Sequence, residues 1–348
     1  MTGAAGRNRS VTLRDVAAEA GTTPMTVSNV VNGRTREVGR ETFARVMEVA
    51  TRMGYRPHAA ARRLRTNRRM AVGVVIVDPA RDYLADPFTS AMLAGLTDRL
   101  GPQGYSLVIH GASQDGVAAV PLLQRIETDA ICVMLSGAES ERREVIGRIA
   151  RLGQPLVLIQ DGIPDDIDDG CSLIQDDFAG GVDLARHLFD RPTRQAVLLI
   201  PRLEWSAMVR REAGIRSVLA GLPNPPAFHA VRCTDEGFDA TQRAFGRHLF
   251  AHGVPDVVIG GNDQMAIAAM KLLIARGSRV PEEVRIGGFN GFSFWRYTQP
   301  ELTTVFSPAY ELGAEAGKAI LARLETGSFP IRAQSLPVRF KANRSSTG

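Results

Sequence analysis

The chain has 348 residues, of which 44% are hydrophobic and 23% charged, a balance typical of a globular protein with two or three domains. It has no run of about 18 apolar residues, and its N-terminus lacks the apolar stretch of a secretory signal, so a membrane span and secretion are both disfavoured. We therefore expect a cytoplasmic protein. Cys132, Cys171 and Cys233 follow no C-x-x-C pattern, as expected of buried thiols in a reducing compartment.

The net charge of +5 conceals a strong asymmetry along the chain. Residues 1–69 hold 14 Arg, no Lys and 5 acids, a net of +9, whereas residues 70–348 hold 28 bases and 32 acids, a net of −4. A small basic module is therefore joined to a larger, slightly acidic one. This asymmetry predicts that the N-terminal module binds an anionic polymer and that the remainder has another task.

Two short helices are predicted after a disordered basic arm formed by residues 1–10. Thr12, with Asp15 three residues later, has the pattern of an N-cap, and Gly21 ends the first helix. Thr23 and Pro24 then supply the N-cap and first residue of a second helix. Two short helices joined by a tight turn form a helix-turn-helix, whose second helix presents its N-terminal residues to the DNA major groove.

A third helix is predicted over residues 40–53, with Phe43, Val46, Met47 and Ala50 on its inward face. Residues 57–66 then read as a short helix, because a first-position proline is followed by alanines and arginines. So short a helix is marginal in isolation, since helix nucleation is costly. We expect this segment to be ordered only when something holds it.

From residue 71 onward, short apolar runs are separated by helix-length intervals. The runs are residues 72–77, 106–109, 130–135, 156–159, 196–200, 257–259 and 284–289. This spacing predicts repeated βα units and parallel sheets that are buried on both faces. Because ligands of such sheets bind beyond the carboxyl ends of the strands, polar residues after each run are candidate ligand-binding groups.

The segments VTLRDVAAEAGTTPMTVSNVVNG (residues 11–33) and GYRPHAAARRL (residues 54–64) resemble the LacI/GalR family of bacterial transcriptional repressors. The resemblance continues in the core, at residues 211–214, 261–266, 288–290 and 300–304. It implies an α/β core of two Rossmann-like lobes, like those of periplasmic sugar-binding proteins, with the effector between the lobes.

The resemblance also implies the limits of the domains. They are a helix-turn-helix DNA-binding domain (11–56), a hinge helix with linker (57–69), a core (70–341) and a tail (342–348). Within the core, the N-lobe is expected at about residues 70–172 and 307–335, and the C-lobe at about 173–306 and 336–341.

In that family the second helix reads operator bases, and a leucine of the hinge helix inserts into the minor groove. Asn29 can bond the adenine edge, Met25 can contact a thymine methyl, and Leu64 between arginines suits insertion between base steps. The predicted DNA-contacting residues are Thr12, Thr23, Pro24, Met25, Thr26, Ser28, Asn29, Asn32, Tyr55, Arg62, Leu64 and Arg65. The alternatives are a solvated helix face for these residues and interdomain packing for Leu64.

The family's effector-binding arginine, asparagine and acid correspond here to Arg211, Asn262 and Asn290. The third is an amide in place of the usual carboxylate, and this loss of negative charge favours an anionic effector such as a sugar acid. Phe88, Asp161 and Trp205 complete the predicted effector site. Trp205 and Trp295 can each stack on a sugar ring or merely cover a lobe edge.

Residues 288–291 and 305–308 resemble the gluconate-type repressors of the family in particular. Asp263 is predicted to be structural, as the cap of a helix starting at residue 264.

No catalytic, cofactor or metal site is predicted. His248 and His252 have metal-capable i, i+4 spacing, but the sequence places no third ligand near them, which favours a surface or half-buried pair. The acidic loop at residues 161–169 lacks the spacing of a calcium site. The phosphate-loop patterns and the nucleophile-elbow pattern G-x-S-x-G are missing as well.

These observations predict a non-enzymatic repressor that binds a palindromic operator as a homodimer or tetramer and is controlled by a sugar or sugar acid. A corepressor-dependent, purine-type regulator of the same fold is the first alternative. A solute-binding protein would explain the lobes but not the basic module. A sugar-modifying enzyme would need an acid–base pair or a metal site.

Overall fold

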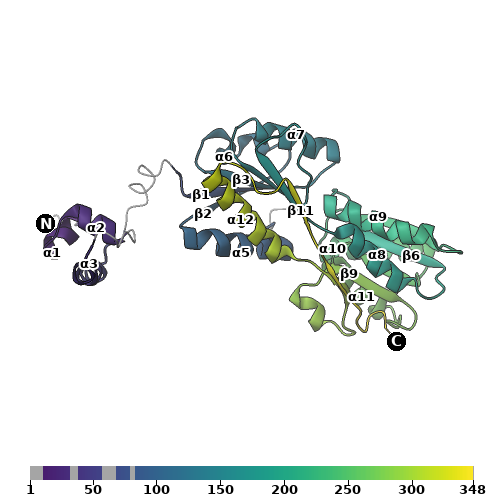
Figure 1. The fold of residues 1–348 in the computed structure, drawn as a ribbon. Coiled ribbons are helices and arrows are strands. Elements are labelled where there is room, and N and C mark those ends of the chain that lie inside the picture. Colours follow the sequence, from purple (N-terminus) through teal and green to yellow (C-terminus); the bar gives the residue numbers. More distant parts are fainter. Residues whose placement is uncertain (1–10, 32–37, 57–67, 79–82, 348) are drawn as a thin grey trace, which may run out of the picture. The chain divides into compact units, whose positions relative to one another are not determined.

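The computed structural model describes residues 11–31, 38–56, 68–78 and 83–347. The chain folds as two compact units, Met1–Arg69 and Met70–Gly348. The first unit contains three helices within its described part (Figure 1): α1 (Leu13–Glu19), α2 (Pro24–Val31) and α3 (Arg40–Arg52). The predicted arm and hinge helix lie largely outside the described residues.

The two predicted helix starts in the first unit are confirmed. The Asp15 amide donates to Thr12 Oγ1 at 3.3 Å and the Thr12 amide donates to Asp15 Oδ2 at 2.8 Å, which is a complete capping box. The Thr26 amide donates to Thr23 Oγ1 at 3.1 Å, directly at the start of α2. Local polar contacts therefore fix both helix starts.

The small core of this unit lies between the three helices and consists of Val16, Ala17, Ala20, Val27, Val30, Val46, Val49 and Ala50. The predicted inward position of Met47 was wrong, because that residue is 39% exposed. The buried stripe of α3 runs through positions 46, 49 and 50, and Met47 lies about 100° around the helix from Val46.

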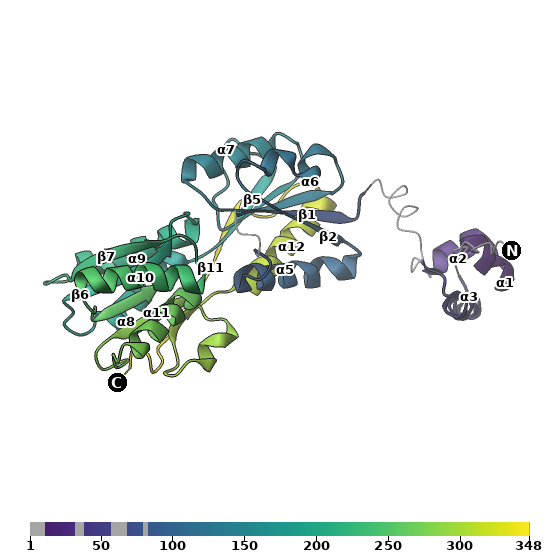
Figure 2. The same cartoon turned by 180° about the vertical axis from the view of Figure 1, so that it is seen from behind.

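The second unit has two lobes, each built on a six-stranded sheet (Figures 1 and 2). The N-lobe sheet is wholly parallel, in the order β11-β5-β4-β3-β1-β2. Its strands are β1 (Ala71–Val77), β2 (Ser106–Ala112), β3 (Ala130–Leu135), β4 (Leu156–Ile159), β5 (Gly170–Gln175) and β11 (Ala333–Leu336). Its helices are α5 (Pro87–Leu100), η2 (Gly101–Gln103), η3 (Val117–Ala119), α6 (Pro121–Gln124), α7 (Glu139–Ala150) and α12 (Ala309–Thr326).

The C-lobe sheet has the order β12-β10-β9-β8-β6-β7, and only β12 is antiparallel to its neighbour. Its strands are β6 (Gln195–Pro201), β7 (Ala227–Cys233), β8 (Val257–Gly260), β9 (Arg285–Asn290), β10 (Thr303–Phe306) and β12 (Arg339–Lys341). Its helices are α8 (Asp177–Leu188), α9 (Ser206–Ala220), α10 (Phe238–His252), α11 (Asp263–Ala275) and η4 (Ser293–Tyr297).

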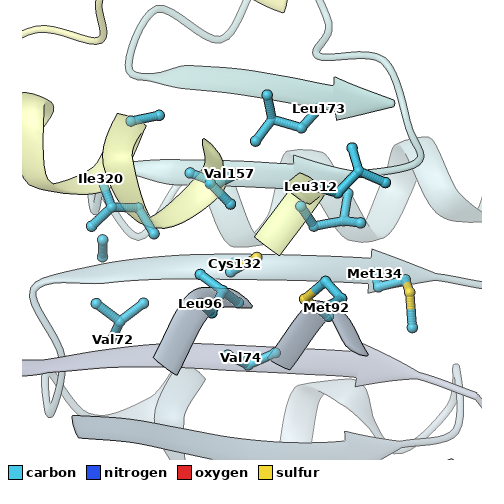
Figure 3. Packing of buried hydrophobic residues seen from close by; sticks show 14 of the residues in the cluster. Val72, Val74, Met92, Leu96, Cys132, Met134, Val157, Leu173, Leu312 and Ile320 are labelled. Atoms are coloured by element: carbon cyan, nitrogen blue, oxygen red, sulfur yellow. The ribbon is translucent and has the colours of Figure 1, made fainter. Parts of the chain in front are cut away.

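Each sheet is buried on both faces, as the apolar runs predict. In the N-lobe, α5 and α12 cover one face and α6 and α7 the other, whereas α8 and α9 face α10 and α11 across the C-lobe sheet. Figure 3 shows Met92 and Leu96 of α5, and Leu312 and Ile320 of α12, over the strands of the N-lobe. No helix within the described ranges is long and apolar enough to cross a membrane.

All seven predicted runs are strands, and the sequence missed β5, β7, β10, β11 and β12. β7 and β11 lie at sheet edges and are partly exposed, so their side chains do not form the continuous apolar run of a central strand. The chain crosses between the lobes three times, after β5, β10 and β11. Each lobe is therefore assembled from separated stretches of sequence.

The predicted tail at residues 342–348 is not a free end in the part that the structure describes. The Ile286 amide donates to the Ser345 carbonyl at 2.8 Å, and the Thr303 amide donates to Ser345 Oγ at 2.8 Å. Asn343, Ser345 and Ser346 are buried. The short polar side chains of this segment satisfy backbone groups beside β9 and β10, which anchors it to the C-lobe.

The α8–α9 helix pair approaches closely through glycine. A Cβ added at Gly181 would lie 2.4 Å from the carbonyl oxygen of Arg211, and one at Gly214 would lie 2.2 Å from that of Phe178. Backbone atoms cannot move aside as the end of a flexible side chain can. The Gly181 contact therefore fixes the position of α9 against α8, and with it the position of Arg211.

We predict that Gly181→Ala lowers the free energy of unfolding by about 1–3 kcal/mol, because α8 and α9 must separate. The matched control is Gly147→Ala in α7, where the nearest atom to an added Cβ is 3.7 Å away. That change should be neutral or stabilise by up to about 1 kcal/mol through helix propensity. Urea denaturation measures both, and equal stabilities of the two variants would contradict the close-packing argument.

Candidate functional site

The exposed N-terminal part of α2 presents the residues predicted to read DNA bases. The Met25 side chain is 70% exposed, unusually high for a large apolar residue, and Pro24 is exposed beside it. Ser28 and Asn29 follow as half-buried residues on the same helix. Pro24 and Met25 thus form an apolar tip at the helix start, and the Asn29 amide lies about one turn further along α2, a combination suited to groove edges.

Three of the predicted DNA-contacting threonines are occupied by helix capping. Thr12 closes the capping box of α1, and the hydroxyls of Thr23 and Thr26 lie 2.9 Å apart at the start of α2. Tyr55 packs against the three-helix core, and its burial raises the pKa of the phenol. Four more predicted contacts, Asn32, Arg62, Leu64 and Arg65, lie outside the described residues.

Arg211 is the centre of a buried polar network at the carboxyl ends of the C-lobe strands. Its side chain is only 4% exposed on α9. Nε donates to Asp177 Oδ1 at 2.8 Å, Nη1 to the Gly261 carbonyl at 2.6 Å, and Nη2 to Asn290 Oδ1 at 2.9 Å. The Phe289 ring lies under the guanidinium, 4.8 Å from its central carbon. The structure thus brings together two of the predicted effector residues, Arg211 and Asn290.

Asp177 holds this network and was not predicted. It is 1% exposed and accepts from both Arg211 and Arg210, the latter at 3.3 Å, as well as from Gln175 Nε2 at 2.7 Å. A buried carboxylate with several charge-assisted donors is well compensated. Removing Arg211 would leave it short of a partner, at a cost of about 3–5 kcal/mol.

Asn262, the third predicted family position, caps α11 and contacts Glu236. Its Oδ1 accepts from the Met265 amide at 3.0 Å, so the predicted cap role of Asp263 was wrong. Asp263 is instead the first helical residue and bonds Thr304 Oγ1 at 2.6 Å and the Gly291 amide at 2.8 Å. The Asn262 amide nitrogen donates to Glu236. The Asn262 side chain therefore caps α11 through its oxygen and contacts Glu236 through its nitrogen. Glu236 was not among the predicted site residues.

Acidic groups from both lobes surround this position. Burial raises the pKa of Glu236 to about 8, and repulsion from the N-lobe residues Asp86 and Asp78 adds to the rise, while Arg211 opposes it. Burial also raises the pKa of Asp86 and takes that of Asp263 to about 7. Perturbed acids that gather at strand ends are typical of a ligand site.

Asp161 belongs to another place in the structure. It accepts from Arg142 Nε at 3.0 Å and from Ser206 Oγ, while its Oδ2 is buried without a hydrogen-bond partner. It borders a pocket of about 750 Å³ formed by α7, the loop at residues 161–167 and α9. Arg211, Asn262 and Asn290 do not line this pocket, so Asp161 is not grouped with them.

The aromatic residues that were candidates for effector contact pack against the hydrophobic cores. Phe88 is buried in the N-lobe core, and Trp295 is buried in the C-lobe core. Trp205 is half-buried and touches the hydrophobic cores of both lobes, and Phe292 of the C-lobe packs against the N-lobe core. Trp205 and Phe292 therefore form an apolar contact between the lobes.

Asp177 and Glu236 were not predicted from the sequence, for one reason. Each follows a strand that was not predicted, β5 in the first case and β7 in the second. The rule that ligand groups follow the carboxyl ends of parallel strands would have selected both, had those strands been assigned.

We predict that Glu236→Gln changes the pH dependence of stability. Between its usual pKa of 4.5 and about 8, Glu236 ionises in the unfolded chain but keeps its proton in the folded one. The contribution of Glu236 to wild-type stability is therefore fully present below pH 4.5 and falls as the pH rises through this window. A glutamine stays neutral, so its contribution does not change with pH. The Tm of the variant relative to wild type should rise from pH 5 to pH 8. Parallel Tm curves would contradict this, and Glu282→Gln, at an exposed position, is the control.

Comparisons with known proteins agree with this arrangement. The family model of bacterial regulatory proteins of the lacI family matches residues 12–58, and that of the periplasmic binding protein-like domain matches residues 185–347. The ribose operon repressor of Escherichia coli (strain K12) is 30% identical over 323 residues, spanning 90% of this chain and 93% of the relative. The gluconate-type branch expected from the sequence is not confirmed.

Two solved structures share the fold. A lac repressor dimer bound to operator and the anti-inducer ONPF matches with a TM-score of 0.81 and 23% identity, covering 98% of this chain and all of that one. A LacI family regulator from Enterococcus faecium with bound ribose matches with a TM-score of 0.67 and 22% identity, covering 80% of this chain and 98% of that one. With its helical N-terminal unit and two-lobed α/β core, this chain belongs to the LacI family of bacterial regulatory proteins and is a DNA-binding transcriptional regulator controlled by a small molecule.

Proposed function

We propose that the protein is a homodimeric repressor whose second helix, α2, reads a palindromic operator and whose inter-lobe cleft binds a neutral polyhydroxylated effector. The basic charge of residues 1–69 suits phosphate, and exposed Met25 and half-buried Asn29 suit base edges. The operator-bound dimer of the lac repressor has the same fold. Leu64 of each subunit would enter the minor groove at the operator centre, flanked by Arg62 and Arg65.

The observation that carries the effector class is the gathering of acids around the Arg211 network. Three nitrogens of Arg211 are already bonded to Asp177, Gly261 and Asn290, so these N–H donors are engaged within the protein. Glu236, Asp86 and Asp78 supply acceptors or protonated carboxyls, which bind the hydroxyl groups of a sugar. A sugar acid would meet repulsion there. We therefore favour a neutral sugar over the sugar acid that Asn290 alone suggested.

Apolar contacts between the lobes offer a route from effector to DNA. Trp205 and Phe292 pack against the N-lobe core, and the Gly137 amide donates to the Glu204 carbonyl at 2.7 Å. A ligand that contacts both Glu236 and Asp86 would shift the equilibrium between lobe arrangements by its differential affinity for them. DNA affinity then changes by the same coupling free energy, if the hinge segments pair in only one arrangement.

The effector class is tested by thermal denaturation of the full chain with ribose, gluconate or purine bases. We expect a neutral sugar to raise the Tm, because a ligand that binds only the folded state stabilises it. Gluconate should give no shift. Glu236→Gln is the variant used to test the effector site, because it keeps the shape of the side chain. Arg211→Ala is unsuitable, because it would leave the buried Asp177 short of a partner. A rise with gluconate or a purine alone would reject the neutral-sugar assignment.

The DNA-reading role is tested with Asn29→Ala and an operator selected in vitro. Loss of a bidentate base contact should weaken operator binding by about 1–3 kcal/mol and relax specificity at one base pair. Binding to random DNA should barely change, because phosphate contacts dominate it. Asn224→Ala, on the exposed surface of the core, is the matched control. Fluorescence anisotropy measures both affinities, and equal losses on operator and random DNA would remove Asn29 from base reading.

A further inference from the structure

Three histidines meet at the edge of the C-lobe. His248 and His252 are one turn apart on α10, and the fold places His229 of the edge strand β7 beside them. The ring centroids are 4.7–5.1 Å apart, and one ligand atom from each ring lies within 4.8 Å of the others. The expectation that no third ligand is near the pair was therefore wrong. His229 was overlooked because β7 was not predicted.

We infer that His229, His248 and His252 bind a divalent transition-metal ion, with Zn²⁺ as the reference ion. Three imidazoles without a thiolate or carboxylate favour zinc, copper and nickel over calcium or magnesium. In the part of the chain that the structure describes, this is the one group of three or more histidine, cysteine or acidic side chains placed to hold a metal. The fourth position of a tetrahedral site would be left to water.

The buried member of the group lacks a partner. His248 is only 8% exposed, and its Nε2 is buried without a hydrogen-bond partner. An unsatisfied buried nitrogen is costly, and a metal bond would remove that cost.

The geometry requires only a small adjustment. Nitrogens bound to one tetrahedral zinc lie about 3.3 Å apart, because each Zn–N bond is about 2.0–2.1 Å. His229 is half-buried and His252 is exposed, so rotation of these two side chains can close the remaining gap to His248. His252 is also the last residue of α10, where the helix dipole favours a cation.

The site lies at the opposite end of the lobe from the candidate effector site. His229 is near the start of β7, whereas Glu236 follows the end of that strand. A bound metal would therefore fasten the edge strand β7 to α10 without entering the cleft. Its expected effect is on the stability of the C-lobe rather than on effector contacts.

The experiment is calorimetric titration of the tag-free, EDTA-treated full chain with Zn²⁺ alone. We expect one saturable site per chain and a rise in Tm of about 5 °C when free zinc is 100 times Kd. His229→Gln and His252→Gln should each weaken binding by at least about tenfold. His110→Gln, a half-buried histidine of the N-lobe, should leave binding unchanged. The absence of saturable binding, or unchanged binding in both variants, would overturn the inference.

A second measurement uses the wild-type chain, so it does not depend on variants that fold. Diethyl pyrocarbonate modifies accessible imidazoles, and mass spectrometry locates the modified residues. Zn²⁺ should protect His229 and His252 while leaving His110 reactive. Equal modification of His229 and His252 with and without zinc would show that the three rings form only a packed cluster.

Discussion

The buried ion pair between Arg211 and Asp177 joins the fold of the C-lobe to its candidate site. Asp177 begins α8 and Arg211 lies on α9, so their 2.8 Å contact ties together the two helices that also touch through Gly181. From there the guanidinium reaches the end of β8 and the end of β9. Removing one partner of a buried pair is expensive, which makes this arrangement rigid. The groups of the candidate effector site are thus positioned by the same contacts that hold the lobe together.

Charge balance within the cleft decides what the site can bind. Arg210 and Arg211 are both engaged by Asp177, whereas Glu236, Asp86 and Asp78 come from different elements, and Asp86 and Asp78 add to the raised pKa of Glu236. On the proposed function, these groups favour the hydroxyl groups of a neutral ligand over an anion. The amide of Asn290, in place of a carboxylate, removes one negative charge from the site. In the proposed function, the surrounding acids matter more for the charge of the effector than this one difference.

The C-lobe has different chemistry at its two ends. After the carboxyl end of β7, Glu236 accepts a hydrogen bond from the Asn262 amide nitrogen. At the start of the same strand, His229 meets His248 and His252 from α10. The edge strand β7 and the residues directly after it therefore supply groups to two separate places. A metal at the histidines would stabilise this edge without changing the charges around Arg211.

The sequence alone determined the features that have a local signal. Thr12 with Asp15 and Thr23 with Pro24 fixed helix starts through contacts a few residues apart, and continuous apolar runs marked seven of the strands, because burial of a strand leaves that pattern. His229 and Arg232 interrupt the apolar pattern of the edge strand β7, so this strand was not predicted, and Glu236 and His229, which follow it or lie on it, stayed hidden. Which carboxylate faces Arg211, and which third histidine joins His248 and His252, depends on neighbours distant in sequence. Only the tertiary structure decided these, because strand order and helix packing bring them together.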